Sequence, residues 1–511
     1  MKRIACVILV FLAASAHAQV RESMTVELVQ VPVYVTTSGG KPVRGLARSA
    51  FELSVDGRPV PIETFDAVDF AAAPREAAGV PRPLRERRLY LLLFDLSFGT
   101  PARLVRAQRA AERAVGHANP ETDFFAVGTY SAQRGVHLIS SFVRERAAVL
   151  RAIYTLHAAK LNDPLGIALS SAERSTWLSA GQMGVTTAAE QEDFASMLEG
   201  EMADAVRGGE ANQEMVRMPA ARLIEYQLGN LGDLAARLGA LEGQKHVVFF
   251  TEGFQSTRVT DIKAKSGPPK FDSRLLSFVN QMHDTFVSAG VMLDAVDILG
   301  LRHTLTDLDN DALYLLARDT GGRVVVNRND LVEAIDNVTT AQSVVYVLGF
   351  NPRDRKSGRI SVRVHGLPRG SEVSYRQGYG FTQAKGGVDS LLLADILVND
   401  IPQNGVTLNA GVTTSDDGAE VAVSFARAEV VPQMTDEGSV DILMYVFDEH
   451  GGGAGFKSKR IGFDARSRVA AGYVTLREPF NLPKGKYSAK VLLRINGTSS
   501  LGFVRRDFAV E

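Results

Sequence analysis

Asp95 and Ser97 are the residues whose types and spacing first suggest chemistry in this chain of 511 residues. They follow six apolar residues, Leu89–Phe94, and precede a Gly-Thr-Pro turn at 99–101. An apolar run of this kind is typical of a strand buried on both faces of a parallel sheet, and ligands bind at the carboxyl ends of such strands. A carboxylate and a hydroxyl two positions apart at such an end can bind one hard cation together.

The elements that would position this pair alternate between strand and helix patterns. Further buried strands are expected at 123–130, 246–250, 291–296 and 323–327, and helices at 102–117, 222–241, 273–288 and 309–319. This alternation predicts one α/β domain at 88–340 with a doubly wound, mostly parallel sheet. A polar, glycine-punctuated segment at about 171–217 is expected to be an insertion in it.

Segments with a period of two surround this domain. The segment 24–70 contains too few short strands for a core of its own, and similar strands return at 341–384. We therefore expect these two segments to pair, so that the α/β domain is inserted between β-sandwich parts. The residues 71–87, rich in Ala, Pro and Arg, are expected to form a linker with a solvated basic cluster at its end. From 388 to 511 we expect an all-β sandwich domain.

The first 18 residues have the three regions of a secretory signal. Lys2 and Arg3 precede an apolar run, and Ala16-His17-Ala18 ends it with small residues. We expect cleavage after Ala18 and a secreted or periplasmic product. No later stretch reaches the ~18 apolar residues of a membrane helix, so we expect no stable membrane insertion after cleavage.

Composition narrows the classes of partner. The chain has 57 Lys and Arg against 58 Asp and Glu, and such a balance gives no electrostatic reason to expect nucleic acid. Cys6, the one cysteine, lies in the signal, so we expect neither a disulfide nor a thiolate metal site in the mature chain.

Several motifs together resemble the von Willebrand factor A (VWFA) family, and more narrowly the VWFA-related Acidobacterial domain proteins. The resemblance covers about 26–381. The motifs are Phe51–Gly57, Gly243–Phe250, Thr320–Arg323, Tyr346–Phe350 and Arg376–Tyr379. It implies a Rossmann-like α/β domain that binds a protein or a surface partner through loops at the carboxyl ends of its strands.

The resemblance also implies a metal-ion-dependent adhesion site, in which Asp-x-Ser-x-Ser, a Thr and an Asp hold Mg²⁺ or another divalent cation. Asp95 and Ser97 match the first two positions. Gly99 replaces the second Ser, with the hydroxyl of Thr100 beside it. Asp163 stands at the Thr position and Glu252 at the last Asp position. The site is therefore degenerate.

Two outcomes follow for these residues. Either Asp95, Asp163 and Glu252 form an altered, more anionic cation site, or polar residues here satisfy loop backbone and helix termini without a metal. Asp297, at the end of another strand, either rims the site or caps the helix that follows.

The leading function is an exported, non-enzymatic binding protein. A structural protein that binds through its β-sandwich without metal is the alternative. A hydrolase that uses the acidic loop cluster is less favoured, because no His forms a partner motif for Ser97.

Overall fold

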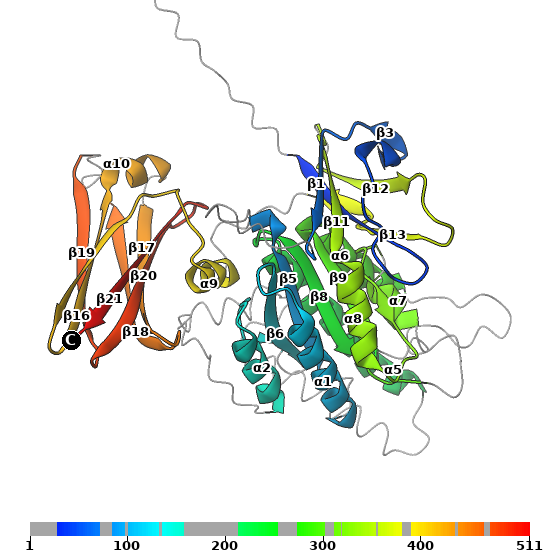
Figure 1. Ribbon diagram of the computed structural model, residues 1–511, viewed down its shortest axis with the longest axis horizontal. Coiled ribbons are helices and arrows are strands. Elements are labelled where there is room, and N and C mark those ends of the chain that lie inside the picture. Colours follow the sequence, from blue (N-terminus) through cyan, green and yellow to red (C-terminus); the bar gives the residue numbers. More distant parts are fainter. Residues whose placement is uncertain are drawn as a thin grey trace, which may run out of the picture.

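A computed structural model describes residues 28–71, 84–97, 101–131, 135–157, 213–253, 273–301, 311–317, 319–353, 356–380, 390–434, 438–463 and 471–511. The described residues form three parts, visible in Figure 1 as an α/β domain, a small β unit beside it and a separate β-sandwich near the C-terminus. None of the described helices combines the length and the apolarity needed to span a membrane.

A six-stranded sheet forms the centre of the α/β domain, in the order β10-β9-β8-β5-β6-β7. All neighbouring strands are parallel except the hairpin of β6 and β7. The strands are β5 (Arg88–Asp95), β6 (Asp123–Ser131), β7 (Gly135–Leu138), β8 (Gln244–Thr251), β9 (Val291–Asp297) and β10 (Val324–Val325). The prediction of a mostly parallel sheet is confirmed, although the last strand is only two residues long.

The alternation of side chains along β5 explains why helices cover both faces of the sheet. Leu89, Leu91 and Leu93 pack into one core, and Tyr90, Leu92 and Phe94 pack into the other. The first core is closed by α5 (Gln213–Leu238), α6 (Ser273–Ala289) and part of α7 (Asp311–Ala317). The second core is closed by α1 (Pro101–His117), α2 (Arg146–Tyr154) and α8 (Leu331–Ala341). All eight residues of β5 are therefore buried.

The small β unit is built from both sides of the α/β domain in the sequence. Its sheets have the orders β13-β1-β11-β4 and β14-β12-β2-β3. The early strands are β1 (Val29–Thr36), β2 (Phe51–Val55), β3 (Arg58–Val60) and β4 (Thr64–Asp69). The late strands are β11 (Val344–Phe350), β12 (Ser357–Val364), β13 (Glu372–Tyr375) and β14 (Gly378–Gly380). Antiparallel pairs such as Val31 with Leu348 join segments that the strand pattern predicted to meet, and apolar side chains of both sheets share one core.

The C-terminal part is a two-sheet sandwich preceded by a helix. The sheets have the orders β15-β16-β19 and β18-β17-β20-β21. Their strands are β15 (Asn409–Ser415), β16 (Gly418–Ala426), β17 (Gly438–Asp448), β18 (Gly453–Phe463), β19 (Tyr473–Asn481), β20 (Gly485–Ile495) and β21 (Leu501–Val510). The expectation of strands alone after 388 was wrong at α9 (Ser390–Asn399) and at the short α10 (Arg427–Val430).

Helix α9 contacts both larger parts of the molecule, which explains why its apolar residues lie on more than one face. Leu391 packs into the core of the α/β domain. Leu393, Ile396 and Leu397 pack against Tyr445 and Leu492 of the sandwich. The helix therefore buries two faces, and its apolar residues do not form the one-sided stripe of an amphipathic surface helix.

Candidate functional site

The expected site lies where the parallel strands end, at what we call the carboxyl edge of the sheet. Asp95 ends β5, Thr251 ends β8 and Asp297 ends β9, and these three strands are neighbours in the sheet. Glu252 follows Thr251 directly. The parallel arrangement therefore places Asp95 and Glu252 on the same edge.

Asp95 is fully buried and accepts hydrogen bonds from three directions. The Thr251 hydroxyl donates to Oδ2 at 2.7 Å, and the Gln227 side-chain amide of α5 donates to the same oxygen at 3.1 Å. The backbone N–H of Ser97 donates to Oδ1 at 2.9 Å. A buried carboxylate is stable only with such donors. Asp95 therefore ties β8, α5 and its own loop together.

Tyr130 lies beside Asp95 because β6 pairs with β5 in this register. Burial raises the pKa of the Tyr130 phenol well above its usual value, and the charge of Asp95 raises this pKa further. The phenol therefore stays protonated. Its hydroxyl has no hydrogen-bond partner among the described residues.

Glu252 forms an ion pair with Arg103 from the first turn of α1. Its side chain is 13% exposed, whereas that of Arg103 is 36% exposed. Arg106, one turn further along α1, donates to the backbone oxygen of Ile298 at 2.6 Å. Two arginines of one helix therefore fix the loops that follow β8 and β9.

Asp297 ends β9 and contacts the loop that follows this strand. It is buried, and its Oδ1 accepts a hydrogen bond from the backbone N–H of Leu299 at 2.8 Å. This contact is a local turn between side chain and backbone, and both alternatives for Asp297 stay predictions.

Protein groups already contact the Asp95 and Glu252 carboxylates of the expected metal site. The protein's own donors occupy the Asp95 carboxylate, and a guanidinium occupies the Glu252 carboxylate. Within the described ranges, no group of three or more His, Cys, Asp or Glu side chains is placed to hold a metal ion. Ser97 is exposed. Thr100 and Asp163 lie outside the described residues, so the five-residue metal site stays a prediction.

Large apolar side chains are exposed on the same loops. Leu96, directly after β5, is 40% exposed, and Leu301, in the loop after β9, is 55% exposed. Their strands are two apart in the sheet, which corresponds to a separation of about 10 Å. The carboxyl edge therefore combines a rigid polar base with exposed apolar side chains.

The sequence motifs did not identify Arg103, Gln227 or Thr251 as residues of this edge. Arg103 could have been recognised from its position, because a cation in the first turn of a helix is unfavourable to the helix dipole and an anionic partner offsets this. Gln227 interrupts the apolar stripe of α5 that includes Ile224, Leu228 and Leu231. A polar residue in such a stripe requires a buried partner.

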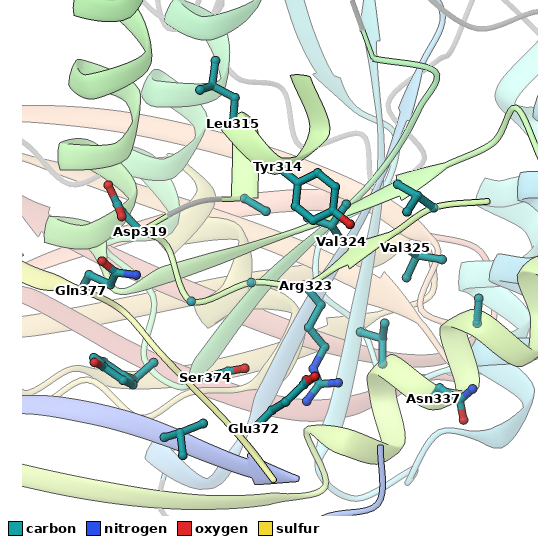
Figure 2. A pocket seen from close by; sticks show the side chains of 18 of the residues that line it. Tyr314, Leu315, Asp319, Arg323, Val324, Val325, Asn337, Glu372, Ser374 and Gln377 are labelled. Atoms are coloured by element: carbon teal, nitrogen blue, oxygen red, sulfur yellow. The ribbon is translucent and has the colours of Figure 1, made fainter. Parts of the chain in front are cut away.

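A separate hollow lies away from this edge, between α7, β10, α8 and β13. Its volume is about 1060 Å³. Figure 2 shows Tyr314, Arg323, Asn337, Glu372 and other side chains around it. Cationic and anionic residues both line the hollow, so its charge favours no class of ligand.

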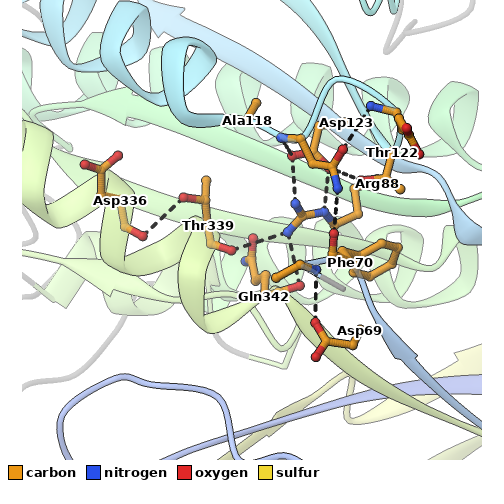
Figure 3. A network of polar contacts seen from close by, with 12 residues as sticks. Asp69, Phe70, Arg88, Ala118, Thr122, Asp123, Asp336, Thr339 and Gln342 are labelled. Atoms are coloured by element: carbon orange, nitrogen blue, oxygen red, sulfur yellow. Dashed lines mark hydrogen bonds and ion pairs between the residues drawn. The ribbon is translucent and has the colours of Figure 1, made fainter. Parts of the chain in front are cut away.

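The opposite end of the sheet, the amino edge, contains a second buried polar cluster (Figure 3). Arg88 donates two hydrogen bonds of 2.7 Å to the Asp123 carboxylate and lies 4.8 Å from the ring centroid of Phe70. Arg88 is 5% exposed and Asp123 is 3% exposed. The arginine also donates to the backbone oxygens of Thr339 and Gln342 at the end of α8.

The prediction of a solvated basic cluster at the end of the 71–87 linker was therefore wrong for Arg87 and Arg88. Arg87 is also buried and pairs with Asp395 of α9 through hydrogen bonds of 3.1 and 2.9 Å. The physical reason is that each arginine meets a carboxylate from a distant segment. Balanced net charge could not reveal either partner.

Three further residues join the α/β domain to the small β unit at the amino edge. His246 Nε2 lies 3.1 Å from the Tyr34 hydroxyl of β1, and His246 Nδ1 lies 3.5 Å from the Asp294 carboxylate. Asp294 also accepts hydrogen bonds from the Arg323 backbone and the Gln342 amide.

Comparisons with known proteins give no family. No family model and no curated protein sequence matches the chain. Among solved structures, the chain is similar to an aerotolerance-related membrane protein from Bacteroides fragilis (9% identity, 50% of this chain and 98% of that chain covered, TM-score 0.26). It is also similar to the conserved hypothetical protein BatB from Bacteroides thetaiotaomicron (10%, 50% and 98%, 0.23). A third structure is the PilB minor pilin from Streptococcus sanguinis (10%, 52% and 63%, 0.28). At these TM-scores the similarity supports no conclusion about function.

Proposed function

We propose that this is an exported, non-enzymatic binding protein that recognises a protein or surface partner with the loops at the carboxyl edge of its parallel sheet. The observation that carries the proposal is the exposure of Leu96 and Leu301 on loops that buried hydrogen bonds and arginines hold in place. Exposed apolar groups on a rigid base favour association, because little conformational entropy is lost on binding.

Recognition in this proposal needs no divalent cation. In a VWFA-like adhesion site a metal ion would neutralise the carboxylates at this edge. Here the Arg103 guanidinium neutralises Glu252, and neutral donors satisfy Asp95. A cation at Glu252 would first have to displace a partly buried arginine.

The same contacts favour binding over hydrolysis. A general base needs a carboxylate that is free to accept a proton from the substrate. Asp95 is buried beneath its donors, and Glu252 is ion-paired. We therefore assign both carboxylates a framework role.

Binding through the C-terminal sandwich is the second candidate. Tyr473 at the start of β19 is 69% exposed, the largest exposure among the large apolar side chains described. In that case the α/β domain is a scaffold, joined to the sandwich through α9 and its Arg87–Asp395 pair.

One experiment separates the two candidates. The mature protein, starting at Gln19, is immobilised and exposed to native envelope extract with chelator and with Mg²⁺. We expect the same partner in both conditions, with capture reduced at least about tenfold by the double variant Leu96→Ser and Leu301→Ser. Tyr473→Ser is the matched control and should capture normally. Loss of capture in Tyr473→Ser alone would replace the leading proposal with the sandwich alternative.

A further inference from the structure

A cavity of about 560 Å³ lies at the junction between the α/β domain and the small β unit. It is bordered by the start of β8, the turn between α6 and β9, the start of β1 and the turn between β13 and β14. Lys245 and Arg376 are the charged residues among those that line it, and no carboxylate is among its described lining residues. The cavity is far from the carboxyl edge, because Lys245 lies near the opposite end of β8.

The two cations are held in place by backbone oxygens. Arg376 is 8% exposed and donates to the carbonyl oxygens of Val287 and Gln30. Lys245 Nζ donates to the Leu241 carbonyl oxygen at 3.0 Å. Neither side chain forms an ion pair within the described part of the chain, and the buried Nε of Arg376 has no acceptor there. A lysine has three N–H donors, so two donors of Lys245 remain for a ligand.

Gly290 shows how close the two cations are. A Cβ atom built on this glycine would lie 3.5 Å from Arg376 Nη1 and 4.0 Å from Lys245 Nζ. One position above the Gly290 backbone is therefore within reach of both positive charges. The positive φ of 65° at Gly290 favours the absence of a side chain there.

A buried arginine and a half-buried lysine that share one position repel each other and lose hydration, and both effects oppose their charged forms. Burial lowers the pKa of Arg376 to about 10. Burial and the charge of Arg376 lower the pKa of Lys245 to about 8, while exposed Glu242 acts in the opposite direction. An anion between the two cations would relieve both costs.

From this geometry we propose that the cavity binds a small organic carboxylate, with its anionic group between Lys245 and Arg376 and an apolar body against the cavity wall. That wall includes Val29, Pro32, Ala236, Ala289 and Val347. A hollow of this volume, lined by both apolar side chains and convergent polar groups, can hold a small molecule. A planar carboxylate matches the guanidinium and the ammonium donors together.

Isovalerate is a suitable probe, because it combines a carboxylate with a compact branched body. Isoamyl alcohol has the same body without the charge. We expect isovalerate to bind the mature protein in calorimetry and to raise its melting temperature, and the alcohol to do neither. Because protonated Lys245 is the binding form, the affinity should fall by about tenfold from pH 7 to pH 9.

Lys245→Met is the decisive variant, and Lys459→Met, an exposed lysine of β18, is its matched control for the loss of one charge. The first variant should weaken isovalerate binding by about tenfold or more and remove the pH dependence, whereas the control should bind like the wild type. Lys245→Met also removes a half-buried charge that Arg376 repels, so the ligand-free variant should be at least as stable as the wild type.

Other results would overturn the inference. These are no isovalerate binding by the wild type, equal binding by Lys245→Met, or equal binding of the alcohol. Inorganic phosphate that bound as tightly as isovalerate would overturn the assignment of an organic carboxylate. None of these results depends on a macromolecular partner, so the test is independent of the proposed function.

Discussion

The two ends of the parallel sheet each contain a buried carboxylate with its hydrogen-bond donors, but the charge of these donors differs between the two ends. At the amino edge, Asp123 lies against Arg88 with two hydrogen bonds of 2.7 Å. At the carboxyl edge, the donors that the structure gives for Asp95 are the neutral groups of Thr251, Gln227 and the Ser97 backbone. Burial is similar at both ends, so the difference lies in the charge of the partners.

This difference corresponds to what each end joins. The Arg88 and His246 clusters lie where the α/β domain meets the small β unit, and Arg87 reaches α9. Charged pairs at such junctions fix one arrangement of segments that are distant in sequence. The Asp95 network instead holds the base of loops that reach solvent at Leu96. We infer that the amino edge stabilises the assembly of the parts and the carboxyl edge orients a binding surface.

The largest effect should come from Arg88→Met. The variant leaves Asp123 buried without its cation, and breaking a buried ion pair in this way costs about 3–5 kcal/mol of unfolding free energy. Urea unfolding of the α/β domain measures it. Arg44→Met, which breaks the exposed Arg44–Asp69 pair, is the control and should cost at most about 1 kcal/mol. An equal loss of unfolding free energy in the two variants would show that burial does not strengthen the Arg88–Asp123 pair relative to the exposed pair.

Asp95→Asn should have a smaller effect. The asparagine side chain has the same shape, but its amide NH₂ group replaces one carboxylate oxygen. This NH₂ group then faces an N–H donor from which the oxygen accepted a hydrogen bond. The expected cost is about 1–3 kcal/mol in the same urea experiment. Partner capture should fall as well, because the loop base loosens. If the variant were as stable as the wild type and captured the partner equally well, Asp95 would not hold the base of these loops.

The acid dependence of stability tests the amino edge. Burial raises the pKa of Asp294, but the contacts with His246, the Arg323 N–H and Gln342 lower it more, so the folded pKa lies below its ordinary value. Ionised Asp294 therefore contributes stability above the unfolded pKa of about 4, and this contribution is lost as the pH falls through the folded pKa.

Asp294→Asn should accordingly be less stable than the wild type at pH 6 and should lose less stability between about pH 5 and pH 3. Unfolding free energies at a series of pH values measure both effects. Parallel curves for the two proteins would mean that Asp294 does not contribute to the acid dependence.

The sequence predicted those features that depend on local patterns. The run before Asp95 predicted a strand buried on both faces, and the parallel sheet follows from repeated runs of this kind. The position of Glu252 on the same edge follows from the order of the elements. The partners were not predictable, because Arg103, Gln227 and Asp395 contact residues between 132 and 308 positions away. Their contacts depend on the assembled fold, which no spacing in the sequence specifies.

The most direct test of the central claim is the response of the melting temperature to divalent cations. The claim is that arginine and neutral donors, and no metal ion, satisfy the carboxylates at the carboxyl edge. Calorimetry of the mature protein with Mg²⁺, Mn²⁺ or Ca²⁺ should therefore give the same melting temperature as with chelator. A bound cation at ~100-fold excess over its dissociation constant would contribute about 2.7 kcal/mol and raise the melting temperature by a few degrees. Such a rise, abolished by Asp95→Ala, would contradict the account.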